Sequence, residues 1–236
     1  MKISFIVPAY NEEFELPRTI AAIQAAANSV ALPWEIVVVN DDSTDATARI
    51  AQEAGATLIN IRRRQIAAAR NAGAQAASGD VLFFVDADTR IAADHVRQAL
   101  DALASGYVGG SARVRADGIV PLWGRLFLHV FSALYFANNL AAGAFVFTSR
   151  VNFQRIGGFD EELYVGEEVY FSFALKKLGR FKLLSLPVVT SGRKLRMYSA
   201  RQILPHFFAI LVRGKRAARK RENCHYWYDG RREITR

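Results

Sequence analysis

Val81-Leu-Phe-Phe-Val-Asp-Ala-Asp88 is an apolar run that ends in two carboxylates, two positions apart. A short continuous apolar run is typical of a strand buried on both faces, as in a parallel sheet. Ligands of open α/β sheets bind beyond the carboxyl ends of the strands, so Asp86 and Asp88 stand where a site is expected. In a loop, both carboxylates can converge on one hard cation such as Mg²⁺ or Mn²⁺. A turn followed by a helix cap is the alternative for the same residues.

The same pattern recurs upstream of this run. Apolar runs at 3–7 and 35–39 also end in polar residues, and a short strand is expected near 57–61. Helical spacing fills the intervals at 15–29, 45–54 and 65–77. This alternation predicts an α/β fold, a Rossmann-like and mostly parallel sheet flanked by helices. Neither G-x-G-x-x-G nor a P-loop occurs, which disfavours a nicotinamide cofactor or an ATPase site.

The second half of the chain has a mixed pattern. Strands are expected at 107–115, 143–148 and 181–189, and helices within 121–137 and 169–178. No linker of Pro, Gly and Ser separates the halves. We therefore predict one domain over residues 1–192, with halves at about 1–105 and 106–192, followed by a basic helical tail at 193–236.

The positive charge of the chain belongs to that tail. The 236 residues carry a formal charge of +9, yet residues 193–236 hold 13 Lys or Arg against 3 Asp or Glu. The tail has no nucleic-acid recognition module, and the acidic strand-end loops would repel phosphate, so no nucleic-acid partner is predicted. One cysteine and four scattered histidines offer neither a disulfide nor a zinc site, and a cytoplasmic setting is the default expectation.

Two stretches bear on membranes. No charged residue occurs from 126 to 149, which is long enough for a span, but His129, two asparagines and Gly143 favour a buried helix and strand. In the tail, the apolar run 203–212 precedes a basic run at 213–221. Residues 203–221 predict either a peripheral helix on an anionic membrane, at its inner face, or a packed helix with a solvated basic end.

Other polar clusters supply candidate ligands for a substrate. Asp41, within Asn40-Asp-Asp-Ser-Thr-Asp45, and Glu12 after the first strand can accept hydrogen bonds from a base imino group or a ribose hydroxyl. The alternative is that Ser43 or Thr44 caps a helix that starts at Asp45. Arg70, in an Ala-rich helix, is either solvated or positioned to hold a diphosphate.

Glu167-Glu168 form the last candidate cluster. They stand at a predicted helix start between apolar neighbours, Val165 before them and Val169 after them. A partly buried carboxylate in this position is a candidate general base for an acceptor hydroxyl, and a solvated acidic surface is the alternative.

Taken together and in order, these motifs resemble inverting family 2 glycosyltransferases of the GT-A fold. The resemblance covers about residues 1–190 and rests on five motifs in register. They are Val7-Pro-Ala-Tyr-Asn-Glu12, Val39-Asn-Asp-Asp-Ser-Thr-Asp45, Ala69-Arg-Asn-Ala-Gly73, Val85-Asp-Ala-Asp88, and Gly157-Gly-Phe-Asp160 with Gly166-Glu-Glu168.

The resemblance implies roles for single residues. Pro8, Tyr10, Glu12, Asn40 and Asp41 would line the nucleoside pocket, with Arg70 near the base or diphosphate and Asp86 near the ribose. Asp88, with Asp86, would ligate a divalent cation, and the second residue of the Glu167-Glu168 pair would be the catalytic base. Three positions depart from the family pattern, because Asn40, Glu168 and Tyr170 stand where the family often has Asp.

The implied function is a metal-dependent inverting transfer of a sugar. The donor would be a nucleotide-diphosphate sugar, and the acceptor a hydroxyl, with a lipid or a membrane-associated glycan among its candidate carriers. A polyprenyl-phosphate acceptor is the alternative; it would arrive ionised and would scarcely need a base. A sugar nucleotidyltransferase fits less well, because the loop after the first strand holds acids in place of a Gly-rich triphosphate loop.

Overall fold

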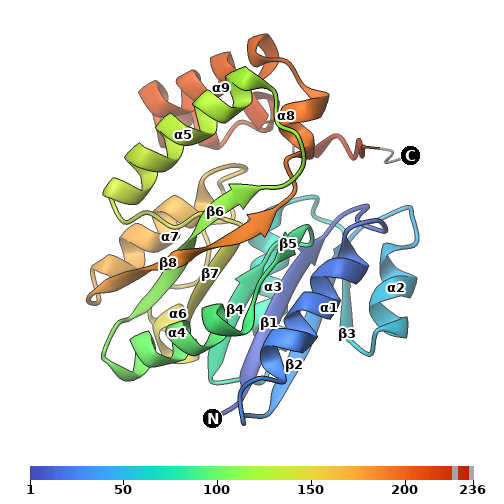
Figure 1. The fold of residues 1–236 in the computed structure, drawn as a ribbon, viewed down its shortest axis with the longest axis vertical. Helices are drawn as coiled ribbons and strands as arrows, with labels where there is room; N and C mark the ends of the chain where they lie inside the picture. Colours follow the sequence, from blue (N-terminus) through green and yellow to red (C-terminus); the bar gives the residue numbers. More distant parts are fainter. Residues whose placement is uncertain (225–227, 234–236) are drawn as a thin grey trace.

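The computed structural model describes residues 1–224 and 228–233, and in this part of the chain one eight-stranded sheet has helices on both faces (Figure 1). The order of its strands is β3-β2-β1-β4-β7-β6-β8-β5. The predicted α/β class is confirmed. The strands are β1 (Ile3–Ala9), β2 (Trp34–Asp41), β3 (Thr57–Ile61), β4 (Val81–Val85), β5 (Thr89–Arg90), β6 (Gly109–Ala116), β7 (Phe145–Ser149) and β8 (Phe181–Thr190).

The first four strands of the sheet order run parallel, as their continuous apolar sequences predict. β1 pairs with β2 and β4, and β2 pairs with β3, all in parallel register. β7 is antiparallel to both β4 and β6 and joins this half to the second. All five residues of β4 are buried, so the run that ends in Asp86 lies at the centre of the sheet.

Helices cover the sheet in two layers, and a third group lies at its end. The helices are α1 (Leu16–Ala27), α2 (Thr47–Glu53), α3 (Ile66–Ala76), α4 (Ala93–Ala104), α5 (Leu122–Ala137), α6 (Arg150–Arg155), α7 (Glu167–Lys176), α8 (Arg193–Met197), α9 (Ala200–Arg213) and α10 (Lys215–Ala218), with a 3-10 turn at Arg221–Cys224. α1, α2 and α4 pack in the core of one face, and α3, α6 and α7 in that of the other.

The third group consists of α5, α8 and α9. They share a small core around Leu195, Tyr198 and Ile203, and they lie beyond the end to which β1–β4 point (Figure 1). The uncharged stretch 126–149 therefore divides into helix α5 and strand β7, as its sequence indicates. In the described part of the chain, every helix is too short or too polar to cross a bilayer. Of the predicted tail 193–236, residues 225–227 and 234–236 lie outside the described part.

One local prediction is wrong. Neither Ser43 nor Thr44 caps α2, which begins two residues later than expected, at Thr47. The N-cap residue is Ala46, which has no capping side chain, and the carboxylate of Asp45 before it accepts the backbone N–H of Thr47 at 2.9 Å. Ser43 instead accepts the N–H of Asn11, because the loops after β1 and β2 bind each other.

Gly73 allows α3 to lie close to the sheet. A Cβ at this position would overlap the side chain of Ile6 and lie 2.9 Å from Val39 Cγ2, one residue from each of the two strands beneath the helix. The backbone of α3 is therefore held against β1 and β2. This approach sets the depth of Arg70, one turn earlier on the same helix.

We expect Gly73→Ala to destabilise the protein by about 1–3 kcal/mol, because the methyl group overpacks this contact. In an exposed helix the same change would stabilise the protein by about 1 kcal/mol. The sign of the change in the free energy of unfolding therefore shows whether the contact with the sheet is tight. Urea unfolding followed by circular dichroism measures the change. Gln75→Ala, at an exposed position of α3, is the control and should stay within about 0.5 kcal/mol of wild type. If the Gly73→Ala variant were more stable than wild type, the tight contact between α3 and the sheet would be refuted.

Candidate active site

The predicted site residues gather at the carboxyl ends of β1, β2 and β4. Pro8 lies in β1, Tyr10 and Glu12 follow it, and Asp86 and Asp88 follow β4. Glu167 and Glu168 come from the other half of the chain as the first residues of α7, after Gly166 in a left-handed conformation (φ 71°). The fold thus brings the two acidic groups of the sequence to one end of the sheet.

Arg70 joins these two groups. Its side chain is 1% exposed; Nη2 lies 2.8 Å from Asp86 Oδ1, and Nη1 lies 2.5 Å from Glu167 Oε1. Nη2 also donates to the carbonyl of Gly143 at 2.8 Å. The alternative of a solvated arginine is excluded, because Arg70 is a structural cation between two carboxylates.

The charge state of this cluster follows from its surroundings. Burial lowers the pKa of Arg70, but Asp86, Glu167 and Glu168 outweigh it, so the net pKa is raised and the guanidinium stays charged. Desolvation raises the pKa of Asp86 to about 6, against the opposing effect of Arg70. Asp86 therefore retains its charge at neutral pH mainly because Arg70 is beside it.

Glu168 has a different environment from Glu167. Its Oε1 accepts the hydroxyl of Tyr135 from α5 at 3.1 Å. Burial and the neighbouring Glu167 charge raise the pKa of Glu168 to about 8. Glu167 is held by Arg70, whereas Glu168 has the proton affinity that suits proton transfer near neutral pH.

Glu12 and Asp88 share a second arginine, Arg193, at the start of α8. Arg193 Nη1 donates to Glu12 Oε2 at 2.7 Å, and its Nη2 lies 3.2 Å from Asp88 Oδ2. Asp88 also accepts the hydroxyl of Thr190 at 3.1 Å. Burial raises the pKa of Glu12 in spite of Arg193. Both aspartates of the D-x-D motif thus have an arginine counter-ion.

The C-terminal segment reaches the same loop. Arg232 lies 3.0 Å from Glu12 Oε1, and its Nε donates to the carbonyl of Asn11 at 2.6 Å. Its guanidinium also stands 5.7 Å from the ring centre of Tyr10, and that of Arg64 stacks over the ring at 3.4 Å. Tyr10 therefore has cationic neighbours from two distant parts of the chain.

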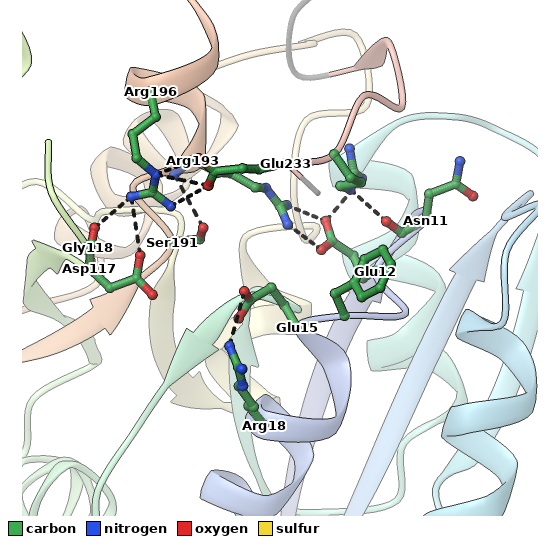
Figure 2. Close-up of a pocket in the computed structure, with 12 residues that line it drawn as sticks. Asn11, Glu12, Glu15, Arg18, Asp117, Gly118, Ser191, Arg193, Arg196 and Glu233 are labelled. Atoms are coloured by element: carbon green, nitrogen blue, oxygen red, sulfur yellow. Dashed lines mark hydrogen bonds and ion pairs between the residues drawn. The ribbon is translucent and has the colours of Figure 1, made fainter. Parts of the chain in front are cut away.

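A cavity of about 180 Å³ lies beside Glu12 (Figure 2). Arg193 points from α8 toward Glu12, while Arg196 points toward Asp117 and Glu233 (Figure 2). Its charged lining residues are four arginines, Arg18, Arg193, Arg196 and Arg232, and four carboxylates, Glu12, Glu15, Asp117 and Glu233. The loop after β1 and the start of α8 meet at this cavity through the contact between Glu12 and Arg193.

Two predicted nucleoside ligands already have partners. Asp41 accepts the backbone N–H groups of Arg63, Arg64 and Gln65 at 2.7–2.8 Å and so holds the start of α3. Asn40 donates to Asn60 Oδ1 at 2.8 Å. Both side chains are buried and shape the loops beside the site. Their role toward a nucleoside stays a prediction.

Sequence reasoning missed three residues of this site: Arg193, Arg232 and Tyr135. The sequence could have indicated Arg193, because this residue comes shortly after β8 and ligands bind at the carboxyl ends of strands. Tyr135 lies in a run that predicts only a buried helix, and Arg232 stands in the basic tail. Nothing local to their sequences indicates a contact with Glu168 or Glu12.

The residues present fit a hard divalent cation only with help from a substrate. The described residues include no cluster of three or more His, Cys, Asp or Glu side chains arranged to hold a metal. Asp86 and Asp88 offer carboxylate oxygens, and Mg²⁺ and Mn²⁺ often use one or two carboxylates with substrate phosphates and water. This donor set therefore fits a metal carried on a diphosphate.

The fold and the edge of acidic residues define a glycosyltransferase of the GT-A class. Residues 4–179 match the family described as glycosyl transferase family 2. The chain belongs to this family, and the resemblance drawn from its motifs is confirmed.

Several relatives match about half of the chain. An undecaprenyl-phosphate 4-deoxy-4-formamido-L-arabinose transferase of Pectobacterium carotovorum is 36% identical over 127 residues, which are 50% of this chain and 38% of that protein. The protein of the same name from Aeromonas hydrophila is 30% identical over 125 residues, or 49% and 38%. The match thus spans less than half the length of these relatives.

Solved structures share the fold over most of the chain. A mannosyltransferase from Pyrobaculum calidifontis, in complex with GDP-Man and Mn²⁺, has a TM-score of 0.65 and 23% identity, covering 89% of this chain and 64% of that one. Glucosyl-3-phosphoglycerate synthase from Mycobacterium tuberculosis, with Mn²⁺ and UDP, has a TM-score of 0.62 and 21% identity, covering 88% and 78%. These likenesses confirm the GT-A fold.

The raised pKa of Glu168 makes a prediction about stability. The folded protein binds a proton at Glu168 that the unfolded chain has lost, so this residue's contribution to the free energy of unfolding falls as pH rises from about 4 to about 8. We expect Glu168→Gln to remove that fall and to become more stable relative to wild type as pH increases. Urea unfolding at about pH 5 and about pH 8 measures the difference.

Glu53→Gln is the control for this measurement, because Glu53 is exposed on α2. Its difference from wild type should be much the same at both pH values. If the difference between Glu168→Gln and wild type were also independent of pH, the raised pKa would be refuted.

Proposed function

We propose that the protein transfers a sugar from a nucleotide-diphosphate sugar to an acceptor carried by a membrane lipid, with inversion at the anomeric carbon. The observation that carries this proposal is the pairing of two acidic groups across Arg70. Asp86 and Asp88 stand on the donor side, and Glu168 stands on the acceptor side beside α5. A single displacement requires these two sides, because the acceptor attacks opposite the leaving group.

On the donor side, the loop after β1 would hold the nucleoside. Tyr10, with the Arg64 guanidinium stacked over its ring at 3.4 Å, would stand beside the base, and Arg193 and Arg232 are cations within reach of a diphosphate at Glu12. Asp88, with Asp86, would hold Mn²⁺ or Mg²⁺. When bound, the cation would offset the negative charge that develops on the departing nucleoside diphosphate. Two structural neighbours were solved with nucleotides and Mn²⁺, which supports this assignment.

On the acceptor side, we favour a polyprenyl phosphate. The relatives are named as undecaprenyl-phosphate sugar transferases, and a phosphate acceptor is already ionised. With its pKa raised to about 8, Glu168 is mostly neutral at pH 7 and does not repel an anion.

A hydroxyl acceptor is the second candidate, and Glu168 favours it in one respect. A carboxylate that titrates near neutral pH is suited to accept the proton of a hydroxyl. In this case the deprotonated form of Glu168 is the active one. The two acceptors therefore predict opposite responses to pH.

The pH dependence of kcat/KM distinguishes them. With a polyprenyl phosphate we expect kcat/KM to fall as pH rises through about 8, because ionised Glu168 repels the acceptor. With the matching polyprenol it should rise over the same interval. Release of nucleoside diphosphate from UDP- and GDP-sugars measures both, in detergent solution. Glu168→Gln should then cost less than about tenfold with the phosphate and about 10²–10⁴-fold with the hydroxyl.

Donor binding is tested separately by titration calorimetry of UDP- and GDP-sugars with Mn²⁺. We expect Asp88→Asn to weaken metal-dependent donor binding by about 10–100-fold, since it removes a carboxylate ligand. Asp101→Asn, at an exposed position of α4, should bind as wild type does. Donor binding that is equally tight without metal would argue against a metal at Asp88.

A further inference from the structure

Helices α5 and α9 each carry an exposed apolar stripe. On α5 it consists of Leu122, Leu126 and Val130, and on α9 of Leu204, Phe208 and Val212. The spacing of i, i+4 and i+8 places each set on one side of its helix. These six side chains are 40–80% exposed, and we call them the helical apolar face.

The sides of both helices next to the stripes are occupied. Phe127 of α5 and Phe207 of α9 meet edge to face at 5.0 Å, and Ile203 is buried in the small core that α5, α8 and α9 share. The two helices lie side by side at the end of the molecule (Figure 1). The stripes therefore face away from the body of the protein and are free to meet a partner.

The charge around this face has one sign. α5, α9 and α10 contain Arg125, Arg201, Arg213, Lys215 and Arg216 and not a single Asp or Glu. Lys215 pairs with Asp160, but the other four are exposed. An apolar stripe bordered by cations is complementary to a surface that is apolar inside and anionic at its boundary.

We propose that the helical apolar face docks on an anionic lipid bilayer. A second copy of the chain is a poorer occupant, because a symmetric contact would bring the arginines of one copy against those of the other. The proposed surface differs from the predicted membrane segment 203–221 in two ways. It adds residues of α5, and it leaves out the end of that segment, because Ala217 and Ala218 are buried and Arg219 pairs with Glu162.

Docking in this manner would deliver the acceptor to the site. α5 bears Leu126 on its exposed side and, near its C-terminal end, Tyr135 in contact with Glu168, so one helix connects the proposed docking face with the candidate base. This step deepens the proposed function and rests on it for the identity of the acceptor. The docking surface itself rests only on the two helices and their charge.

Vesicle co-sedimentation tests the surface. The probe is vesicles of phosphatidylcholine with about 30% phosphatidylglycerol, free of donor and acceptor. We expect wild type to bind, Leu126→Glu/Phe208→Glu to bind at least about tenfold more weakly, and about 0.5 M NaCl to weaken but not abolish wild-type binding. The control Val151→Glu/Phe173→Glu makes the same change at two exposed apolar positions elsewhere and should bind within about twofold of wild type.

Thermal unfolding of both variants verifies that they are folded. The proposal is overturned if wild type does not bind, if the face variant binds as wild type does, or if light scattering shows a dimer that the face variant dissociates. The vesicles contain no substrates, so a wrong acceptor would not change this result. Conversely, transfer to an acceptor in detergent would survive the loss of docking, which separates the two failures.

Discussion

The buried guanidinium of Arg70 is the constraint on which the site depends. It touches the end of β4, the first turn of α7 and the carbonyl of Gly143 before β7. Removing one partner from a buried ion cluster costs about 3–5 kcal/mol, because the remaining charges lose their counter-ion. Arg70 in turn owes its depth to Gly73, which lets α3 approach the sheet. The packing of α3 on the sheet therefore determines the position of Arg70 in the candidate site.

Arg193 and Arg232 neutralise a second pair of neighbouring acids, Glu12 and Asp88. Glu12 is buried and Asp88 lies near it, so the two acids would repel each other if nothing positive stood between them. Arg193 contacts both carboxylates, and Arg232 contacts Glu12 while holding the backbone of the Tyr10–Glu12 loop. These contacts tie the loop after β1 to α8 and to the C-terminal segment. The same two arginines could also pair with the diphosphate of a donor, which would then take the place of the carboxylates as their counter-ion.

The sequence predicted most of the fold and the acidic residues of the candidate site, but not the arginines and the tyrosine that contact them. Continuous apolar runs such as Val81–Val85 predict buried strands because burial on both faces leaves no polar alternation, and all the predicted strands are present. The strand-end rule found Asp86 and Asp88. It could not show that Asp41 holds backbone N–H groups of the next loop, or that Tyr135 reaches Glu168 across 33 residues, because both contacts depend on how separate elements pack.

The basic tail shows why net charge alone is a weak guide to function. Eight of its 13 Lys and Arg residues fall into three groups that differ in their surroundings. Arg193 and Arg232 neutralise buried acids of the site, and Arg196, Lys215 and Arg219 pair with carboxylates at the surface. Arg201, Arg213 and Arg216 lie exposed beside the helical apolar face. Exposed charges act on a bilayer only within about a Debye length, roughly 8–10 Å, so these three and the exposed Arg125 on α5 are the cations that the proposed docking would use. The cations of the tail are thus divided between the candidate site, the protein surface and the proposed docking face.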